Sequence, residues 1–332
     1  MKAALLTKFN SPLEFVDAEP LPLQHGQVFV KVLQSGICGA QLQEISGAKG
    51  DRLNRFMGHE AAVEVLQVGE GVALKTGQKC VAHWRRGAGI ESQFPRYQVN
   101  GEALTSGLIT TFSTHSVISE NRLTPVADDV PLDLCALLGC GLSTALGTIE
   151  NEADLKFGET VLIIGCGGLG ANLILAAKLR QASFIGVVDI ADKRAIALRM
   201  GASEFAQLGS EPSQCLSNGV FDVVIDTTGN ASAIAQGVRA LGSGGRFVMV
   251  GQPNGSITLP ARDMFSGEGK RIIATQGGQF RPDKDIPRYV AMWRAGLLKL
   301  DGLVTHRFPL DEINQGLDLV RQGQAGRVMV QL

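Results

Sequence analysis

The sequence of 332 residues lacks the features that mark several broad classes of protein. It has no apolar run of about 18 residues, the length that a membrane-spanning helix needs, and its N-terminal apolar segment is too short for a signal peptide. The formal net charge is −1 and no basic block is present, so nothing favours nucleic acid or an anionic membrane as a partner. We therefore expect a cytoplasmic protein that acts on a small molecule.

Cysteine is present without a pairing pattern. Length predicts two domains, and a content of 45% hydrophobic residues with 41 glycines predicts a large core with many strand-to-helix turns. In such a chain, reduced thiols or metal ligands are favoured over disulfides. The six cysteines are Cys38, Cys80, Cys135, Cys140, Cys166 and Cys215.

The clearest motif is an apolar run, 160–164, that continues into glycines spaced Gly-x-Gly-x-x-Gly. This pattern predicts a buried strand, a tight turn and the start of a helix. Gly165 would allow the turn, Gly167 would let the backbone approach a pyrophosphate, and Gly170 would let the helix pack close to the strand. The free N–H groups of the helix N-terminus would bind the phosphates.

A second apolar run, 184–188, ends at Asp189, about 20 residues further on, as in dinucleotide-binding units. A carboxylate there can accept hydrogen bonds from the ribose hydroxyls and would repel a 2′-phosphate, which favours NAD over NADP. Without a ligand, the same residues would form an ordinary turn and a solvated strand end.

The rhythm of the chain changes near residue 143. Before that point, alternating apolar residues predict a mainly antiparallel β domain. After it, strand and helix alternate, which predicts a doubly wound parallel sheet. The expected parallel strands are 160–165, 184–189, 204–208, 221–226, 246–251 and 271–275. The expected helices are 168–180, 191–200, 231–241, 286–298 and 311–322, followed by a strand at 327–332.

Three short clusters at glycine-marked positions carry thiols and an imidazole. They are 36–39 with Cys38, 58–60 with His59 and Glu60, and 139–144 with Cys140. Two thiols and an imidazole suit Zn²⁺, and three protein ligands leave the open position that a catalytic zinc requires. Each cluster alone is weak evidence for a metal site. A cysteine beside glycine is more often a small buried apolar residue than a ligand, and a His-Glu pair is more often an ordinary surface or core pair.

Taken together, these motifs resemble the medium-chain, zinc-dependent alcohol dehydrogenase superfamily, and the tail 311–316 also fits. The resemblance covers nearly the whole chain. It implies an α/β protein with a GroES-like β-rich catalytic domain, 1–142, completed by 280–332. It also implies a Rossmann domain, 143–279, with a doubly wound six-stranded parallel sheet. Relatives pair through the edge of that sheet, here near 256–273, so the resemblance implies a homodimer or homotetramer.

The resemblance also implies roles for particular residues. Cys38, His59 and Cys140 would bind one catalytic zinc, with Glu60 just behind them or exchanging into the metal shell. NAD would contact Thr144 near its nicotinamide and Arg194 and Arg327 near its adenosine and pyrophosphate. Trp84 and Phe112 would line the substrate pocket. The remaining expected cofactor contacts are the glycine loop with Gly168 and Leu169, Asp189 and Val250.

One departure from the family is the lack of cysteine between residues 81 and 134. Many relatives bind a second, structural zinc there through four cysteines, so we predict no structural zinc. In its place stands a long polar segment, 83–108. Arg85, Arg86 and Arg96 could bind an anionic or hydroxyl-rich substrate, or the segment could be a solvated loop that serves a subunit contact.

A second departure concerns the proton that an alcohol must lose. Relatives place a hydroxyl residue two positions after the first zinc cysteine, and here that residue is Ala40. The family's neighbouring acid is Gln41, and its frequent relay histidine is Gln43. Glu44 and His83 are the candidate replacement bases, and zinc-bound water is an alternative proton carrier.

These observations favour a zinc-dependent oxidoreductase that transfers hydride between NAD(H) and a secondary alcohol or its ketone. The polar segment suggests a sugar- or polyol-derived substrate. Two other interpretations stay open. One is a zinc-free quinone or enoyl reductase of the same superfamily. The other is a non-catalytic NAD(H)-binding protein with a relict metal site.

Overall fold

The chain leaves its first structural unit after Cys140 and returns to it at Arg281. The computed structural model describes residues 1–50, 52–208, 216–253 and 255–332, so Cys215 lies outside the described residues. One unit consists of Met1–Cys140, Arg281–Leu300 and Val304–Leu332. The other consists of Gly141–Phe280 with Asp301–Leu303.

The first unit is built around strand β3 (Gln27–Ile37), which pairs antiparallel with β5 (Glu60–Val68). Every second residue of the segment from Val28 to Val32 is fully buried, as the apolar alternation predicts. The larger sheet runs β10-β6-β5-β3-β18-β17, with β9 also paired to β3, and the smaller runs β4-β1-β2-β7-β8. The other strands are β1 (Lys2–Leu6), β2 (Glu14–Pro20), β4 (Arg55–Phe56), β6 (Lys79–His83), β7 (Arg96–Val99), β8 (Glu102–Thr105), β9 (His115–Ser119), β10 (Leu123–Pro125), β17 (Val304–Pro309) and β18 (Arg327–Gln331).

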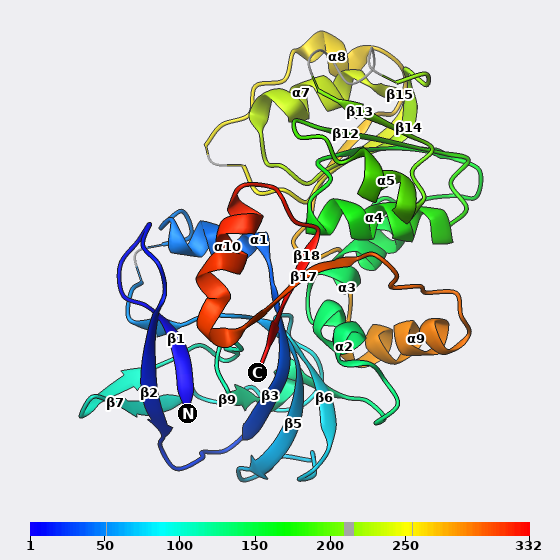
Figure 1. Cartoon of the computed structure of the whole chain (residues 1–332). Helices are drawn as coiled ribbons and strands as arrows, with labels where there is room; N and C mark the ends of the chain where they lie inside the picture. The colour runs from blue at the N-terminus through cyan, green and yellow to red at the C-terminus, as the bar shows by residue number, and fades with distance from the viewer. Residues whose placement is uncertain (51, 209–215, 254) are drawn as a thin grey trace. The chain divides into compact units, whose positions relative to one another are not determined.

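The end of the chain completes this first unit. Strand β18 lies antiparallel to β3, with Val328 opposite Ile37, so the last strand in Figure 1 lies beside one of the first. Helix α10 (Ile313–Arg321) buries Ile313 and Leu317 in the same apolar core. The remaining helical segments of the unit are α1 (Gly39–Ile45), η1 (Glu120–Arg122), α2 (Leu132–Leu138), α9 (Pro282–Arg294) and η3 (Leu310–Glu312).

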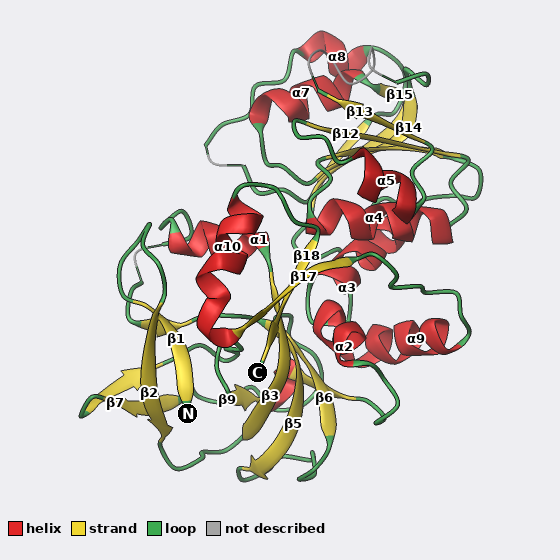
Figure 2. Ribbon diagram, viewed as in Figure 1, coloured by secondary structure: helices red, strands yellow, loops and turns green. Residues whose placement is uncertain are grey.

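The second unit is a parallel sheet in the order β13-β12-β11-β14-β15-β16. Helices α4 and α5 lie on one face of the sheet and α7 and α8 on the other (Figure 2). The strands are β11 (Thr160–Ile164), β12 (Phe184–Asp189), β13 (Glu204–Gln207), β14 (Phe221–Asp226), β15 (Leu241–Met249) and β16 (Arg271–Ala274). The helical segments are α3 (Gly141–Gly147), η2 (Thr148–Glu152), α4 (Gly168–Leu179), α5 (Arg194–Met200), α7 (Ala231–Arg239) and α8 (Ala261–Phe265).

The structure confirms the predicted fold class, a GroES-like β-rich part and a doubly wound Rossmann sheet. The predicted starts of two elements differ most from the structure. Helix α9 begins at Pro282 rather than at 286, because proline suits the first turn of a helix, where its missing N–H is not needed. Strand β15 begins at Leu241 rather than at 246, because the backbone pairs with β14 across a register shift.

No single helix among the described residues is long and apolar enough to cross a bilayer. One bent pair, Leu132–Leu138 with Gly141–Glu152, reaches that length and composition together.

Candidate active site

The register of the larger sheet brings two distant segments together. Ser35 on β3 lies opposite Ala61 on β5, so Cys38, just after β3, lies close to His59, just before β5. Helix α2 packs on β5, and Cys140 follows two residues after that helix. Three clusters that are separate in the sequence therefore meet at one end of the sheet.

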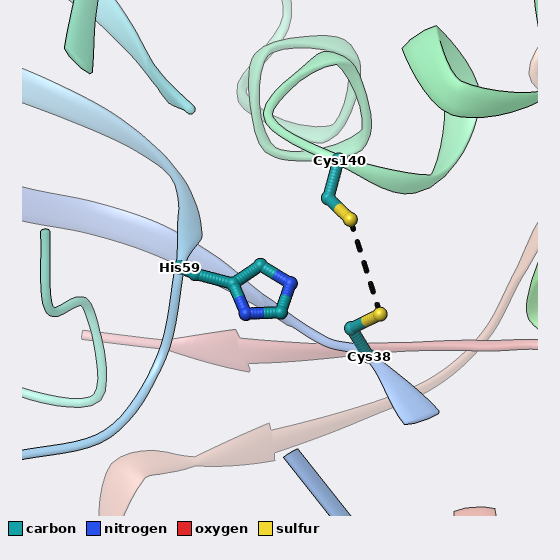
Figure 3. A group of neighbouring side chains, drawn as sticks. All are labelled: Cys38, His59 and Cys140. Carbon is teal, nitrogen blue, oxygen red and sulfur yellow. Dashed lines mark hydrogen bonds between the residues drawn. The ribbon is translucent and has the colours of Figure 1, made fainter. Parts of the chain in front are cut away.

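The side chains of Cys38, His59 and Cys140 point toward one another (Figure 3). Their ligand atoms all lie within 4.8 Å of one another, and the two sulfurs are 3.9 Å apart. Two sulfurs bound to one tetrahedral zinc at about 2.3 Å would lie about 3.8 Å apart. The cluster therefore fits zinc, and its three protein ligands leave a fourth position for a substrate oxygen.

The electrostatics of the cluster also suit a cation. The hydrogen bond with Cys140 holds the pKa of Cys38 well below its usual range, and the same contact raises the pKa of Cys140, because one sulfur carries the charge and the other the proton. Burial alone would lower the pKa of His59, but the Cys38 sulfur and nearby carboxylates raise it. The buried Nε2 atom of His59 has no hydrogen-bond partner among the described residues, and it is the ring nitrogen turned toward the two sulfurs in Figure 3.

Glu60 lies directly behind the cluster and is fully buried. Its carboxylate forms an ion pair with the Arg327 guanidinium, which is only 3% exposed. Burial raises the pKa of Glu60, and Arg327 opposes that rise. In this structure the Arg327 guanidinium is engaged with Glu60, and the expectation that Arg327 lies near the cofactor pyrophosphate stays a prediction.

Helix α1 carries the residues at which the sequence departs from the family. Ala40 has no hydroxyl to pass a proton. Gln41 is fully buried and contacts both Cys38 and His59. Glu44, one of the two candidate bases, pairs with Arg55 at 3.0 Å, and its charge is close enough to contribute to the raised pKa of His59.

The structure does not support His83 as a base. Its Nδ1 atom is 2.7 Å from the carbonyl oxygen of Arg85, and its Nε2 atom is 2.9 Å from the hydroxyl of Thr124. Burial lowers the pKa of His83 to about 3. This neutral imidazole links β6 and β10, and proximity in sequence was misleading because His83 is fully buried at the end of β6 with both ring nitrogens engaged.

The residues predicted to line the substrate pocket differ in burial and in their contacts. Phe112 is fully buried in the apolar core with Met57. Trp84 is half-buried, and the Arg85 guanidinium lies over its ring, 5.6 Å from the ring centroid. Arg86 is exposed and pairs with Glu91 at 3.5 Å.

The 83–108 segment is held by its own polar contacts. Glu91 also pairs with Arg122 at 3.4 Å, and the buried Glu120 accepts hydrogen bonds from the backbone N–H groups of Ile90 and Ala73. Arg96 is exposed on β7. These ion pairs and hydrogen bonds explain how the segment is held in place, and substrate binding by its arginines stays a prediction.

The glycine loop in the second unit has the geometry that the motif predicts. Gly165 has a φ of +94°, a conformation that favours glycine, and directly follows β11. A Cβ atom at Gly170 would lie 2.0 Å from the carbonyl oxygen of Gly165, so only glycine allows this contact of helix and strand. A Cβ atom at Gly167, where α4 is capped, would meet no atom of the described residues within 4 Å. The helix N-terminus, with Gly168 and Leu169 in its first turn, therefore has room for a phosphate group.

The other predicted cofactor residues lie around this loop or further along the unit. Asp189 ends β12, and its carboxylate accepts hydrogen bonds from the N–H groups of Cys166 at 2.6 Å and Ala191 at 2.9 Å. Val250 follows β15, at the same edge of the sheet. Arg194 begins α5 and lies over the ring of Phe205, and Thr144 is buried in α3.

Sequence reasoning missed the segment that supports the glycine turn. Thr227 directly follows β14. Its hydroxyl lies 3.0 Å from the carbonyl oxygen of Ile164 and 3.2 Å from that of Gly165, so these two acceptors share one donor hydrogen. Before it, the buried Asp226 accepts hydrogen bonds from Thr228 and Gly229. An acid at a strand end followed by Thr-Thr-Gly is the signal that could have indicated this turn.

Comparison with known proteins agrees with this architecture. Residues 24–128 match the family model described as alcohol dehydrogenase GroES-like domain, and residues 168–294 match the one described as zinc-binding dehydrogenase. An alcohol dehydrogenase zinc-binding domain protein from Burkholderia ambifaria is 25% identical, with a TM-score of 0.90 over 100% of this chain and 98% of that one.

Two further solved structures are similar over their whole length. Benzyl alcohol dehydrogenase from Acinetobacter calcoaceticus is 25% identical, with a TM-score of 0.89 over 100% of this chain and 99% of that one. An alcohol dehydrogenase from Thermus sp. ATN1, 22% identical with a TM-score of 0.85 over 100% of both chains, shares the fold. The chain belongs to the medium-chain, zinc-dependent alcohol dehydrogenase-like superfamily of oxidoreductases.

Proposed function

We propose that the protein is a zinc- and NAD(H)-dependent dehydrogenase that interconverts an alcohol, in our prediction a secondary one, and its carbonyl compound. The observation that carries this proposal is the convergence of Cys38, His59 and Cys140 within 4.8 Å in a chain of this superfamily. A sugar- or polyol-derived substrate stays a prediction from the sequence.

In this proposal, the candidate metal ligands of the first unit and the ion pair behind them each have a defined role. Cys38, His59 and Cys140 hold the metal, and the half-buried positions of Cys38 and His59 leave one side open to substrate. Zinc at this site would supply a Lewis acid that lowers the pKa of an alcohol and polarises a carbonyl. Glu60 places a buried negative charge behind the ligands, balanced by Arg327.

The second unit would hold the cofactor. The backbone of the glycine loop and the N-terminus of α4 would bind the pyrophosphate, and Asp189 would accept hydrogen bonds from the adenosine ribose. Nicotinamide would supply the hydride acceptor in alcohol oxidation. Because Asp189 already holds the loop through Cys166, the same carboxylate would couple the shape of the phosphate site to recognition of the ribose.

The zinc-free reductase interpretation is less well supported than the zinc-dependent one. A zinc-free enzyme has no need for two sulfurs at the separation that one zinc requires, yet this chain keeps them 3.9 Å apart. A non-catalytic NAD(H)-binding protein would keep the glycine loop and bind cofactor without turnover.

The decisive experiment measures zinc per chain in protein purified without chelator, followed by NAD⁺ reduction with a panel of primary, secondary and polyol alcohols. We expect one zinc per chain, activity lost on chelation and activity restored by zinc. Protein that takes up no zinc would contradict the mechanism. Bound zinc and bound NADH without turnover on any alcohol or ketone would support the non-catalytic interpretation, and two zinc ions per chain would contradict the predicted lack of a structural site.

A further inference from the structure

We propose that Gln41 is a positioning residue that limits the zinc affinity of the cluster, because it holds the ligand His59 in the hydrogen-bonding state that is wrong for a metal ligand. This inference rests on the proposed function, since it takes the cluster of Cys38, His59 and Cys140 as a zinc site.

The orientation of the Gln41 amide is fixed by the backbone. The Oε1 atom of Gln41 accepts a hydrogen bond from the N–H of Cys38 at 2.9 Å, and the N–H of Gln41 donates to the carbonyl oxygen of Cys38 at 3.0 Å. A backbone N–H can only donate, so the oxygen end of the amide must face Cys38. The NH₂ end, Nε2, therefore faces Nδ1 of His59, with which it is in hydrogen-bond contact.

This contact decides where a neutral His59 carries its hydrogen. One nitrogen of a neutral imidazole donates and the other accepts. Because Nδ1 accepts from Gln41, the hydrogen must lie on Nε2, the ring nitrogen turned toward the two sulfurs in Figure 3. A metal needs the lone pair of that same nitrogen. A doubly protonated imidazole would not remove this conflict, because its Nδ1–H would point at the amide NH₂, which is also a hydrogen-bond donor.

Zinc binding therefore has to disturb this arrangement. Either the hydrogen moves to Nδ1, where it meets the amide NH₂, or the amide turns over and loses its bond to Cys38. A metal-bound histidine normally donates its other N–H to a carboxylate, a carbonyl or water, and loss of that partner typically costs about 10–100-fold in metal affinity. Glu44 is the nearby carboxylate on the same helix, but it pairs with Arg55.

The test is the substitution Gln41→Glu, which keeps the length of the side chain. One carboxylate oxygen can still accept from Cys38 N–H, and the other can accept from Nδ1–H of His59. We expect zinc affinity to rise about 10–100-fold, measured by competition with a chromophoric chelator at fixed pH and ionic strength. The matched control is Gln43→Glu, which adds the same charge to the same helix, and we expect it to change affinity by less than about threefold.

Nitrogen NMR of His59 in the zinc-free protein gives a second measurement that does not depend on zinc affinity. We expect hydrogen on Nε2 in the wild type and on Nδ1 in Gln41→Glu. Hydrogen on Nδ1 in the wild type would overturn the inference, as would equal zinc affinity of wild type and Gln41→Glu, or an equal gain in Gln43→Glu. In those cases zinc still binds and the proposed function stands, whereas failure of every protein to bind zinc would refute both.

Discussion

The three zinc-ligand candidates come from positions 38, 59 and 140, whereas the glycine loop comes from one stretch between 160 and 170. The loop depends on local backbone contacts, such as the close approach of Gly170 to Gly165. The cluster depends on the register of β3 with β5 and on partners such as Gln41 and Glu60. Each site can therefore be disrupted by a change that leaves the structure of the other intact.

Substitution of a metal ligand should have the largest effect and should be confined to the cluster. In Cys140→Ser, a hydroxyl replaces a thiolate that ligates zinc far better. We expect zinc to fall well below one per chain and kcat/KM to fall by about 10³-fold, since a Lewis acid supplies several kcal/mol of transition-state stabilisation. Elemental analysis and steady-state kinetics measure the two effects.

Cofactor binding by the second unit should not change in the same variant. NADH affinity of Cys140→Ser, measured by fluorescence, should stay within about threefold of wild type, because the glycine loop is untouched. Cys135→Ala, a substitution five residues earlier on α2, is the control and should retain zinc. Full activity in a zinc-depleted Cys140→Ser protein would contradict the zinc mechanism.

The converse substitution disrupts the glycine loop. In Gly170→Ala, the new methyl group meets a backbone oxygen at 2.0 Å, which cannot yield without moving the helix or the turn. Overpacking of this kind costs up to about 3 kcal/mol, so we expect NADH affinity to fall by about 100-fold and thermal stability to fall as well. Zinc content should remain that of the wild type.

Gly167→Ala is the matched variant within the same loop. Its methyl group meets no atom within 4 Å in the described part of the chain, so thermal stability should not change. NADH affinity should still fall if the backbone at Gly167 approaches the pyrophosphate. Unchanged NADH affinity in Gly167→Ala would show that the phosphate lies elsewhere.

Most of the fold could be predicted from local patterns. The apolar runs before Gly165 and Asp189 indicated parallel strands, and alternation in β3 and β5 indicated an antiparallel sheet. Helix starts set by single residues, such as Pro282 for α9, were misplaced because the apolar periodicity does not mark them.

The candidate site was less predictable, and the reason is physical. The motif in the second unit is contiguous, so strand, turn and helix follow from one stretch of sequence. The candidate ligands Cys38, His59 and Cys140 were identified through family resemblance, since nothing in the sequence shows which strands pair. The contact of Gln41 with His59 and the burial of Arg327 against Glu60 depend on that pairing, so only the structure reveals them.

The smallest expected effect comes from a comparison of two histidines of the first unit, the half-buried His59 and the fully buried His83. His59 has one ring nitrogen without a hydrogen-bond partner among the described residues, while both nitrogens of His83 are engaged. The unfolded chain protonates His83 near its ordinary pKa of about 6.5, but the folded chain does so only near 3. Stability must therefore fall as pH drops below about 6.5, because the unfolded state then binds more protons.

From pH 7 to pH 5, this one group should lower the free energy of unfolding by about 2 kcal/mol. Urea denaturation of zinc-free protein should show that His83→Gln loses this part of the acid sensitivity, whereas His25→Gln, at an exposed position, keeps it. The pH profile of kcat should be the same in His83→Gln and in wild type, since an imidazole bonded at both nitrogens cannot accept a proton from substrate. An altered profile would restore His83 as a candidate base, and an unaltered one would leave Glu44→Gln as the next variant to measure.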